Sequence, residues 1–403
     1  MRKVPKLRFK EFSDEWEENK LVEISDKIGD GIHSTPIYSE NGNYYFINGN
    51  NIKDKKILYF IDTKRVNLEE YEKYKLNLNN NTILISINGT IGNLGYYNFE
   101  KIILGKSCGY ITLKNIINKD FIYNYLMLNK IKIYFDKELT GTTIKNLSLK
   151  TLKNTLILLP GIQEQEKIAN FLTSVDKKIS LTEEKLELFR EYKKGVMQKI
   201  FSQELRFKDS NGNDYPEWEE KRLGEIAFFS KGKLISKEDI TEAGIECIRY
   251  GELYTTYKEK IEKIVSKTKL EKNKLILSEK NDVIIPSSGE TAIDIAVASC
   301  VMKDGVALGA DLNIIKTKEN GLYLAYFINN PAKLELASLA QGASVIHLYE
   351  KHLKLLNIQL PILEEQQKIA DFLSSIDNKI ESIEKELEGL KEFKKGLLQQ
   401  MFV

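Results

Sequence analysis

The chain contains one segment twice, and this duplication limits its fold more than any other feature. Residues 159–201 and 360–402 align without a gap at a constant offset of 201, and about half of their positions are identical. The offset is almost half of the 403-residue length. An internal repeat of fixed period predicts a chain built from two copies of one structural unit.

Landmarks upstream of the repeated segments support the same division. The stretch Leu7–Phe9 recurs as Leu205–Phe207, and Trp16 recurs as Trp218 after a four-residue insertion. We interpret the two tryptophans as core anchors rather than as base-stacking residues. We therefore expect diverged domains at residues 1–157 and 202–358, each followed by a repeated segment, at residues 158–201 and 359–403.

The repeated segments have the pattern of long helices. Pro160 and Pro361 end the preceding strand-like runs and suit the start of a helix. Apolar residues then follow in alternating steps of four and three, the coiled-coil period, over about 50–60 Å of helix. The stripes fit an antiparallel pair within the chain, a parallel pair, or pairing between two chains. The predicted contact residues are Ile168, Leu172, Val175, Ile179, Leu186, Phe189, Val196, Ile200, Ile369, Leu373, Ile376, Ile380, Ile383, Leu387, Leu390, Leu397 and Met401.

The diverged domains alternate short β-rich runs with turns that contain Gly and Asn. In the first domain we expect strands at residues 44–47, 82–87, 102–104, 110–113 and 155–159, and a helix over 121–135. In the second we expect strands at 247–249, 283–285, 307–308 and 313–316, and a helix over 322–328. The predicted fold is α+β: two such domains joined by two long helices.

The overall charge excludes a protein that holds nucleic acid by bulk charge. Lys and Arg number 60 and Asp and Glu 58, for a net charge of +2. By segment, residues 1–157 carry +6 and residues 202–358 carry −2. The first domain is basic enough to favour phosphate contacts. If the second also binds DNA, it must rely on local placement of charge or on a partner.

The sequence predicts a cytoplasmic protein without a membrane span. No apolar run approaches the ~20 residues that cross a bilayer, and the charged first residues lack the apolar stretch of a signal peptide. Cys108, Cys247 and Cys300 are far apart and odd in number, so they indicate neither a disulfide framework nor a zinc site. We expect three buried free thiols.

We find no motif for catalysis, so the chain is predicted not to be an enzyme. The [DNS]PP[YFW] motif of amino-group methylation is missing. Residues 105–107 resemble the end of a P-loop, but Glu100 stands where the first glycine is required. The three histidines have no metal-binding spacing. We expect no metal and no cofactor in this chain.

The repeated LP…EQ(E/Q)KIA(N/D)FL(T/S)S(V/I)D segment resembles the conserved region of the specificity subunit of type I restriction–modification systems. The KLRF…EW-EE start of a unit and the ISINGTIG strand and turn resemble the same family, and the resemblance covers essentially the whole chain. It implies that each diverged domain is a target recognition domain for one half of an asymmetric, bipartite DNA site. It also implies that the helices form an antiparallel coiled coil that sets the gap between the half-sites.

The resemblance further implies double-stranded DNA, two methyltransferase (modification) subunits and restriction/translocase subunits as partners. S-adenosylmethionine and ATP with Mg²⁺ would belong to those partners. The alternative is a coiled-coil structural scaffold without direct DNA recognition, which predicts no salt-dependent DNA binding even with the methyltransferase present.

The resemblance maps candidate DNA contacts onto two loops of each domain. Glu290 departs from the family's GTIG pattern; it could accept from a cytosine amino group, or it could be a solvated loop charge. The glycines of these loops are interpreted as turn residues with positive φ. The basic pairs Lys55-Lys56 and Lys64-Arg65 are predicted to contact phosphates. The remaining candidates are Ser86, Asn88, Gly89, Thr90, Thr140, Thr142, Thr143, Lys145, Asn146, Ser287, Ser288, Gln341, Ser344 and His347.

Overall fold

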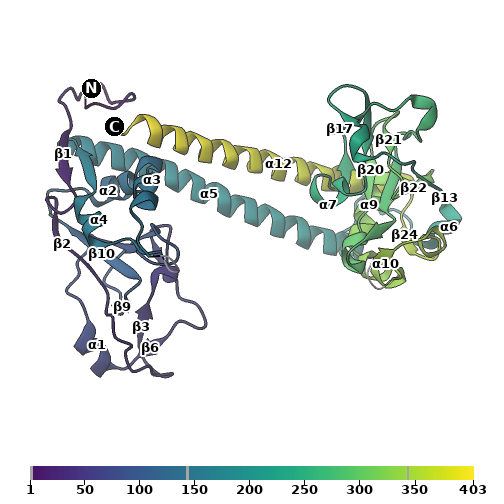
Figure 1. The fold of residues 1–403 in the computed structure, drawn as a ribbon. Coiled ribbons are helices and arrows are strands. Elements are labelled where there is room, and N and C mark those ends of the chain that lie inside the picture. The colour runs from purple at the N-terminus through teal and green to yellow at the C-terminus, as the bar shows by residue number, and fades with distance from the viewer. Residues whose placement is uncertain (1–2, 142–144, 343–344) are drawn as a thin grey trace. The chain divides into compact units, whose positions relative to one another are not determined.

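The computed structural model describes residues 3–141, 145–342 and 345–403 (Figure 1). The chain forms two compact units, Met1–Glu183 with Glu386–Val403, and Glu184–Lys385. Each unit holds one α+β domain and a stretch of both long helices, α5 (Ile162–Phe201) and α12 (Leu363–Gln400). The long helices begin inside the predicted repeated segments.

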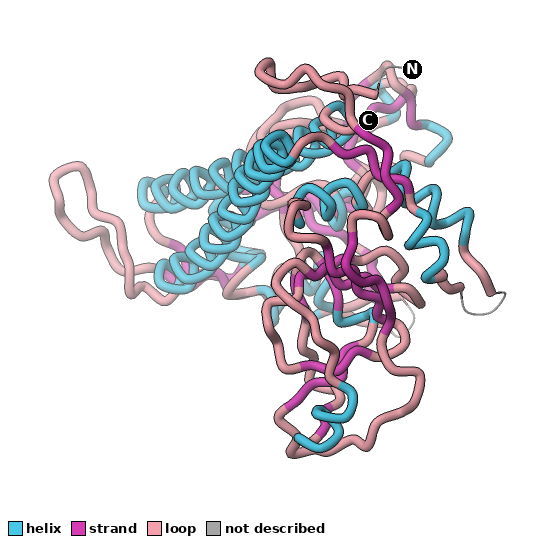
Figure 2. The backbone as a smooth tube through the Cα atoms, turned by 90° about the vertical axis from the view of Figure 1, so that its left-hand side faces the viewer, coloured by secondary structure: helices cyan, strands magenta, loops and turns pink. Residues whose placement is uncertain are grey.

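The domain of the first unit is built on a four-stranded antiparallel sheet in the order β2-β10-β7-β8. Smaller sheets pair β6-β3-β9, β1 with β11, and β4 with β5. Figure 2 shows strands in the middle of this domain and long loops around them. Its elements are β1 (Glu17–Lys20), β2 (Ser25–Asp30), β3 (Tyr44–Ile47), β4 (Ile52–Lys53), β5 (Lys56–Ile57), β6 (Arg65–Val66), α1 (Leu68–Tyr74), β7 (Thr82–Ser86), β8 (Leu94–Tyr96), β9 (Ile102–Leu104), β10 (Cys108–Leu113), α2 (Lys119–Leu126), α3 (Asn129–Glu138), α4 (Leu149–Asn154) and β11 (Leu156–Leu159).

Strand β7 is buried on both faces of this sheet. Because side chains alternate along a strand, Ile83 and Ile85 join one apolar cluster and Leu84 joins another. The first cluster also contains Ile168 of α5 and Phe402, which follows α12. The ends of the long helices are therefore part of the domain core.

The second unit repeats this plan with additional strands. Its largest sheets have the orders β13-β22-β18-β20-β16 and β14-β17-β15-β21. The remaining sheets pair β12 with β24 and β19 with β23. Its elements are β12 (Glu219–Arg222), α6 (Leu223–Ile226), β13 (Ala227–Lys231), β14 (Ile240–Thr241), β15 (Ile245–Ile248), α7 (Glu252–Thr255), β16 (Lys260–Ile261), β17 (Ser266–Thr268), β18 (Asp282–Pro286), β19 (Ser288–Gly289), α8 (Ala292–Ile295), β20 (Ser299–Val301), β21 (Ala307–Leu308), β22 (Leu312–Thr317), α9 (Gly321–Asn329), α10 (Lys333–Leu339), β23 (Ile346–His347), α11 (Glu350–Leu353) and β24 (Asn357–Leu360).

Within each unit the two long helices pair antiparallel, as one of the three predicted arrangements requires. Within each unit, residue numbers rise along α5 and fall along α12 from the first inter-helix ion pair to the last. All predicted stripe residues are buried or half-buried, and Thr182, the polar residue in the first stripe, is buried with them. The inter-helix pairs are Asp176–Lys394, Lys178–Glu386 and Glu183–Lys391 in the first unit, and Arg190–Glu384 and Lys193–Asp377 in the second.

The structure contains every predicted strand, with end shifts of up to two residues, and the predicted helix of the second domain. The helix predicted over 121–135 is wrong as a single element, because the chain forms α2 and α3 with a break between them. Leu128 has extended backbone angles there, with φ −60° and ψ 142°, and precedes the first residue of α3. The apolar period continues through the break, so the pattern alone did not reveal it.

Among the described residues, no helix is both long enough and apolar enough to cross a membrane. Cys108, Cys247 and Cys300 are all buried free thiols, as predicted.

The burial of these thiols predicts low reactivity. Burial raises the pKa of Cys247 to about 11 and that of Cys300 to about 12, and it also raises the pKa of Cys108. Because the thiolate is the reactive form, we expect no labelling of the native chain at about pH 8 and labelling of all three after denaturation. Rapid labelling of the native chain would contradict this.

The same burial predicts that the stability of the chain depends on pH. Since the thiols of the unfolded chain have a pKa of about 8.5 and burial raises it in the folded chain, the free energy of unfolding should fall as the pH rises above that value.

Candidate nucleic-acid interface

The two loops predicted for the first domain lie against each other. The backbone N–H of Leu147 donates to the carbonyl of Ile87 at 2.8 Å, and a β-bridge joins Asn88 to Asn146. Thr140 and Asn146 close the second loop through two backbone hydrogen bonds of 3.0 and 2.8 Å. We call residues 87–93 and 140–146 the first loop pair. It contains the predicted Asn88, Gly89, Thr90, Thr140, Lys145 and Asn146.

The glycines of the first loop pair take the left-handed backbone conformation, as predicted, but the prediction is wrong for Gly289 of the second domain, which lies in strand β19 without a positive φ. The φ angles of Gly89, Gly92 and Gly141 are 71°, 85° and 93°. A side chain at Gly89 or Gly92 would meet no atom within 4 Å, so backbone conformation rather than crowding favours glycine there. The open space also leaves this part of the backbone accessible.

Ser86 lies in the interior rather than on the loop surface. Its side chain is fully buried, its hydroxyl donates to the carbonyl of Thr90, and it accepts from the backbone N–H of Asn93 at 3.0 Å. Thr90 is exposed and donates through Oγ1 to the carbonyl of Gly49 at 3.3 Å. The contact predicted for Ser86 therefore needs correction, because this hydroxyl holds the loop in shape.

The second domain builds an equivalent pair of loops. Ser288 pairs with His347 in a short antiparallel ladder, and Gln341 and His347 exchange backbone hydrogen bonds of 2.9 and 2.7 Å. We call residues 287–291 and 341–347 the second loop pair. Gln341 and Glu290 are exposed, and His347 is half-buried beside Tyr349, with ring centroids 5.8 Å apart.

Ser287 repeats the behaviour of Ser86. It is buried, its backbone N–H donates to Asp311 at 2.8 Å, and its carbonyl accepts from Leu348 at 3.1 Å. Its side chain does not face solvent, so its predicted contact also needs correction. The predicted Thr142, Thr143 and Ser344 lie outside the described residues, and those assignments stay predictions.

Three of the four predicted phosphate-binding side chains are exposed. Lys56 and Lys64 lie at the surface, and Arg65 is exposed with its guanidinium 5.1 Å from the centre of the Tyr45 ring. Lys55 differs, because its Nζ lies 2.9 Å from the Asp176 carboxylate of α5. A phosphate contact by Lys55 would compete with this ion pair, so we withdraw it as a candidate.

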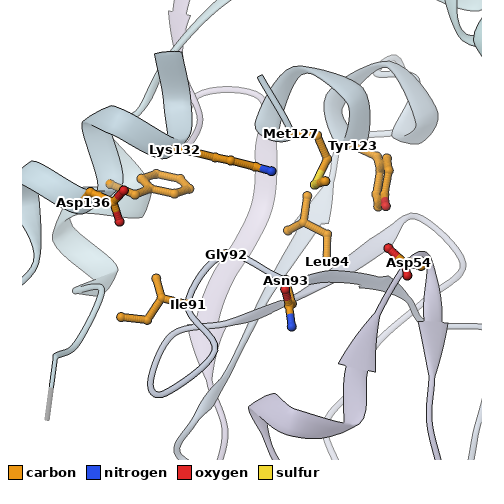
Figure 3. A pocket seen from close by; sticks show the side chains of 10 residues that line it. Asp54, Ile91, Gly92, Asn93, Leu94, Tyr123, Met127, Lys132 and Asp136 are labelled. Atoms are coloured by element: carbon orange, nitrogen blue, oxygen red, sulfur yellow. The ribbon is translucent and has the colours of Figure 1, made fainter. Parts of the chain in front are cut away.

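A pocket of about 200 Å³ lies between the first loop pair and helices α2 and α3. Figure 3 shows Ile91 and Asn93 on the loop side, with Lys132 and Asp136 on the helix side. Pockets that bind drug-sized ligands have volumes of about 300–1,000 Å³. This pocket is smaller, and we assign it no cofactor.

An ion pair that was not predicted from the sequence holds each domain against its long helix. Glu164 is buried and accepts from Nε and Nη2 of Arg8 at 2.8 and 2.7 Å. In the second unit Glu365 accepts from the same atoms of Arg206 at 3.2 and 2.8 Å. The available signal was that both members of this pair recur in both copies.

The tryptophans are core residues, as predicted. Trp16 is 2% exposed and packs edge-on against Phe121 and Phe402. Trp218 is 9% exposed, and its indole N–H donates to Glu365 at 3.1 Å. Neither ring is available to stack on a base in this conformation.

Both units match one family model, described as the type I restriction modification DNA specificity domain, at residues 13–188 and 215–392. The chain belongs to this family. Both matches include a domain with its loop pair and most of a long helix. The membership confirms the resemblance noted in the sequence.

Relatives in this family extend over most of the chain. The putative type I restriction enzyme MjaX specificity subunit of Methanocaldococcus jannaschii is 27% identical over 393 residues, covering 93% of this chain and 89% of the relative. The MjaVIII specificity subunit of the same organism is 26% identical over 324 residues, covering 75% and 73%.

Solved structures confirm the fold of this specificity-domain family over the whole chain. The S subunit of a type I restriction–modification system from M. genitalium superposes with a TM-score of 0.61 at 20% identity, covering 99% of both chains. A structure from work on complex assembly and conformational transition of the type I system gives a TM-score of 0.54 at 15% identity, covering 96% and 97%.

Proposed function

We propose that this chain is the DNA-reading subunit of a type I restriction–modification complex. Each recognition domain reads one half of an asymmetric, bipartite DNA site through its loop pair, and the antiparallel long helices set the spacer between the halves. The observation that carries this proposal is that both domains build the same loop pair from different side chains. Equivalent scaffolds with different surfaces are what two unlike half-sites require.

The chemistry of the loop pairs suits base reading. Asn146, Lys145 and Gln341 offer amide and ammonium groups of the kinds that bind base edges in the major groove. Thr90 and Thr140 add hydroxyls that suit bases or phosphates. The exposed Lys56, Lys64 and Arg65 provide phosphate contacts in the first domain.

In this proposal the chain itself is not catalytic. Two modification subunits dock on the long helices and methylate adenine with S-adenosylmethionine, and restriction subunits supply ATP- and Mg²⁺-dependent translocation and cleavage. Because the second domain is less basic than the first, the partner subunits supply many of the contacts to DNA phosphates around it. The chain alone should bind its site more weakly than the assembled methyltransferase does.

A selection experiment tests this function. The chain, assembled with its modification subunits, is incubated with a pool of duplexes of random sequence, and the bound DNA is sequenced. We expect one asymmetric motif with a fixed unspecified gap. Retention of DNA without any enriched motif, or no salt-dependent binding, would favour the scaffold function instead.

Replacing Gln341 by alanine is expected to relax selection at one position of one half-site. A well-placed bidentate amide contributes about 1–3 kcal/mol of discrimination, so the preference for that base should fall while the other half-site keeps its full preference. The measurement is the same selection repeated with the variant complex. Gln163→Ala, an exposed glutamine of α5 outside both loop pairs, is the control. Unchanged preference at every position would remove Gln341 from the interface.

A further inference from the structure

One carboxylate at the same repeated position of each long helix is shared between the other helix and a recognition domain. In the first unit this residue is Asp176 of α5. It accepts from Nζ of Lys394 of α12 at 2.5 Å and from Nζ of Lys55 at 2.9 Å. Lys55 lies in the turn between β4 and β5 of the recognition domain. A single side chain thus joins three parts of the unit.

The second unit has the same junction at the equivalent residue, Asp377 of α12. Its carboxylate lies 2.7 Å from Nζ of Lys193 on α5 and accepts from the hydroxyl of Tyr326 at 2.5 Å. Tyr326 belongs to α9 of the second recognition domain. The helix-side lysines, Lys394 and Lys193, also occupy equivalent positions of the repeat. The domain-side partner of the carboxylate differs, an ammonium in one unit and a phenol in the other.

The partners at both junctions are held in place rather than free to reorient. Lys55 has a φ of 67°, in the left-handed region, and its ammonium lies 5.0 Å from the centre of the Tyr123 ring. The hydroxyl of Tyr96 donates to Asp120 at 2.6 Å, and that carboxylate lies 3.8 Å from Lys55. In the second unit Lys193 also lies 3.5 Å from Glu259. Polar networks of this kind restrict geometry because each member has several partners.

The charges at the first junction reinforce one another. Burial alone would raise the pKa of Asp176, but hydrogen bonds from Lys394 and Lys55 outweigh it and lower that pKa below its ordinary value. The Asp176 carboxylate is 25% exposed, so solvent screens the pair only partly. The Asp176 carboxylate is therefore ionised at neutral pH, and it lies between two lysines that would otherwise repel each other.

We propose that Asp176 and Asp377 are positioning residues that fix the angle at which each recognition domain is held on the helix pair. This inference rests on the proposed function for its consequence: a domain held at one angle accepts its half-site at one spacer length only. Neither carboxylate belongs to a loop pair, so we expect each to act on spacing and not on the bases that are read.

The first experiment measures the angle without DNA. Spin labels are placed on the full chain at Ile133→Cys of α3 and Ser180→Cys of α5, both exposed positions of the first unit. Asp176→Asn is expected to broaden the distance distribution between the labels, and Lys55→Ala to broaden it equally. Glu183→Gln, the same chemical change at an ion pair of 2.6 Å with Lys391 on the other helix, should leave it narrow. An Asp176→Asn distribution as narrow as that of the control would overturn the proposal.

The second experiment measures the consequence with the complete methyltransferase. Binding is compared on duplexes that carry the selected motif with its natural spacer, or with a spacer one base pair longer or shorter. Asp176→Asn should reduce the preference for the natural spacer by about fivefold, or ~1 kcal/mol, with unchanged base preference in both half-sites. Full spacer preference together with a broadened distribution would overturn the link to spacing. If the unaltered complex selects no bipartite site, the proposed function fails, and the label distances still decide the positioning role.

Discussion

Replacing Glu365 by alanine is expected to destabilise the second unit by about 1–3 kcal/mol, because the half-buried guanidinium of Arg206 and the buried indole N–H of Trp218 lose the acceptor that they share. Glu365 is 0% exposed and accepts from Nε and Nη2 of Arg206 and from the indole N–H of Trp218. Arg206 also donates to the carbonyl of Pro216 at 2.6 Å, so the carboxylate holds the entry segment of the unit against α12.

The two tryptophans make this prediction measurable unit by unit. Trp16 lies in the core of the first unit and Trp218 in that of the second, and they are the only tryptophans in the sequence. In urea unfolding of the full chain, a Trp16→Phe background reports on the second unit and a Trp218→Phe background on the first. Glu365→Ala should shift the transition of the second unit far more than that of the first.

The matched control is another glutamate of α12. Glu381 is exposed and pairs with Lys385 one turn away, and such surface pairs contribute about 0.3–0.5 kcal/mol. A Glu365→Ala shift no larger than that of Glu381→Ala would contradict the assigned role of the carboxylate.

Exchange of the first recognition domain is expected to change one half of the methylated motif and leave the other half intact. The first loop pair is fixed by β7 and by backbone contacts within its own unit, and the second by β19 and β23 in the other. Since the two surfaces share no residue, each half-site should follow its own domain. Methylation sequencing of cells that express the chimera measures the result.

The structure indicates suitable boundaries for the exchanged segment. Strand β1 pairs with β11 in an antiparallel register from Glu17↔Leu159 to Lys20↔Leu156, and β11 directly precedes α5 in the chain. Exchange of residues 21–155 keeps both strands, and with them the contact between Arg8 and Glu164. The donor domain must supply a cation where Lys55 meets Asp176. A chimera that methylates two new half-sites would refute independent reading.

The sequence predicted the architecture well because the determining signals are periodic. A gap-free repeat fixes the number of units, and a four-and-three apolar stripe fixes the long helices. The direction of helix pairing did not follow from the stripes, because apolar contacts are nearly insensitive to it. The ion pairs that reveal it join residues about 200 positions apart.

The candidate site was predicted less well, and the errors share a physical cause. The family resemblance identified both loops of each pair, because their motifs match the family's pattern at these positions. It did not separate exposed polar residues from buried ones: Ser86 and Ser287 face inward, and Lys55 is engaged by Asp176. Polar residue type alone does not encode burial, which depends on contacts between distant segments. The recurrence of Arg8 as Arg206 and of Glu164 as Glu365 was the unused signal for the ion pairs that hold each domain on its long helix.

The central claim is tested most directly by the adenine methylation of cells that carry this chain together with its modification subunits. Genome-wide methylation sequencing is compared between these cells and cells in which only this chain is deleted. We predict one asymmetric, gapped motif that is methylated in the first population and completely unmethylated in the second. If the assembled subunits are present and deletion of the chain removes no methylated motif, the chain does not direct methylation, and the account is wrong.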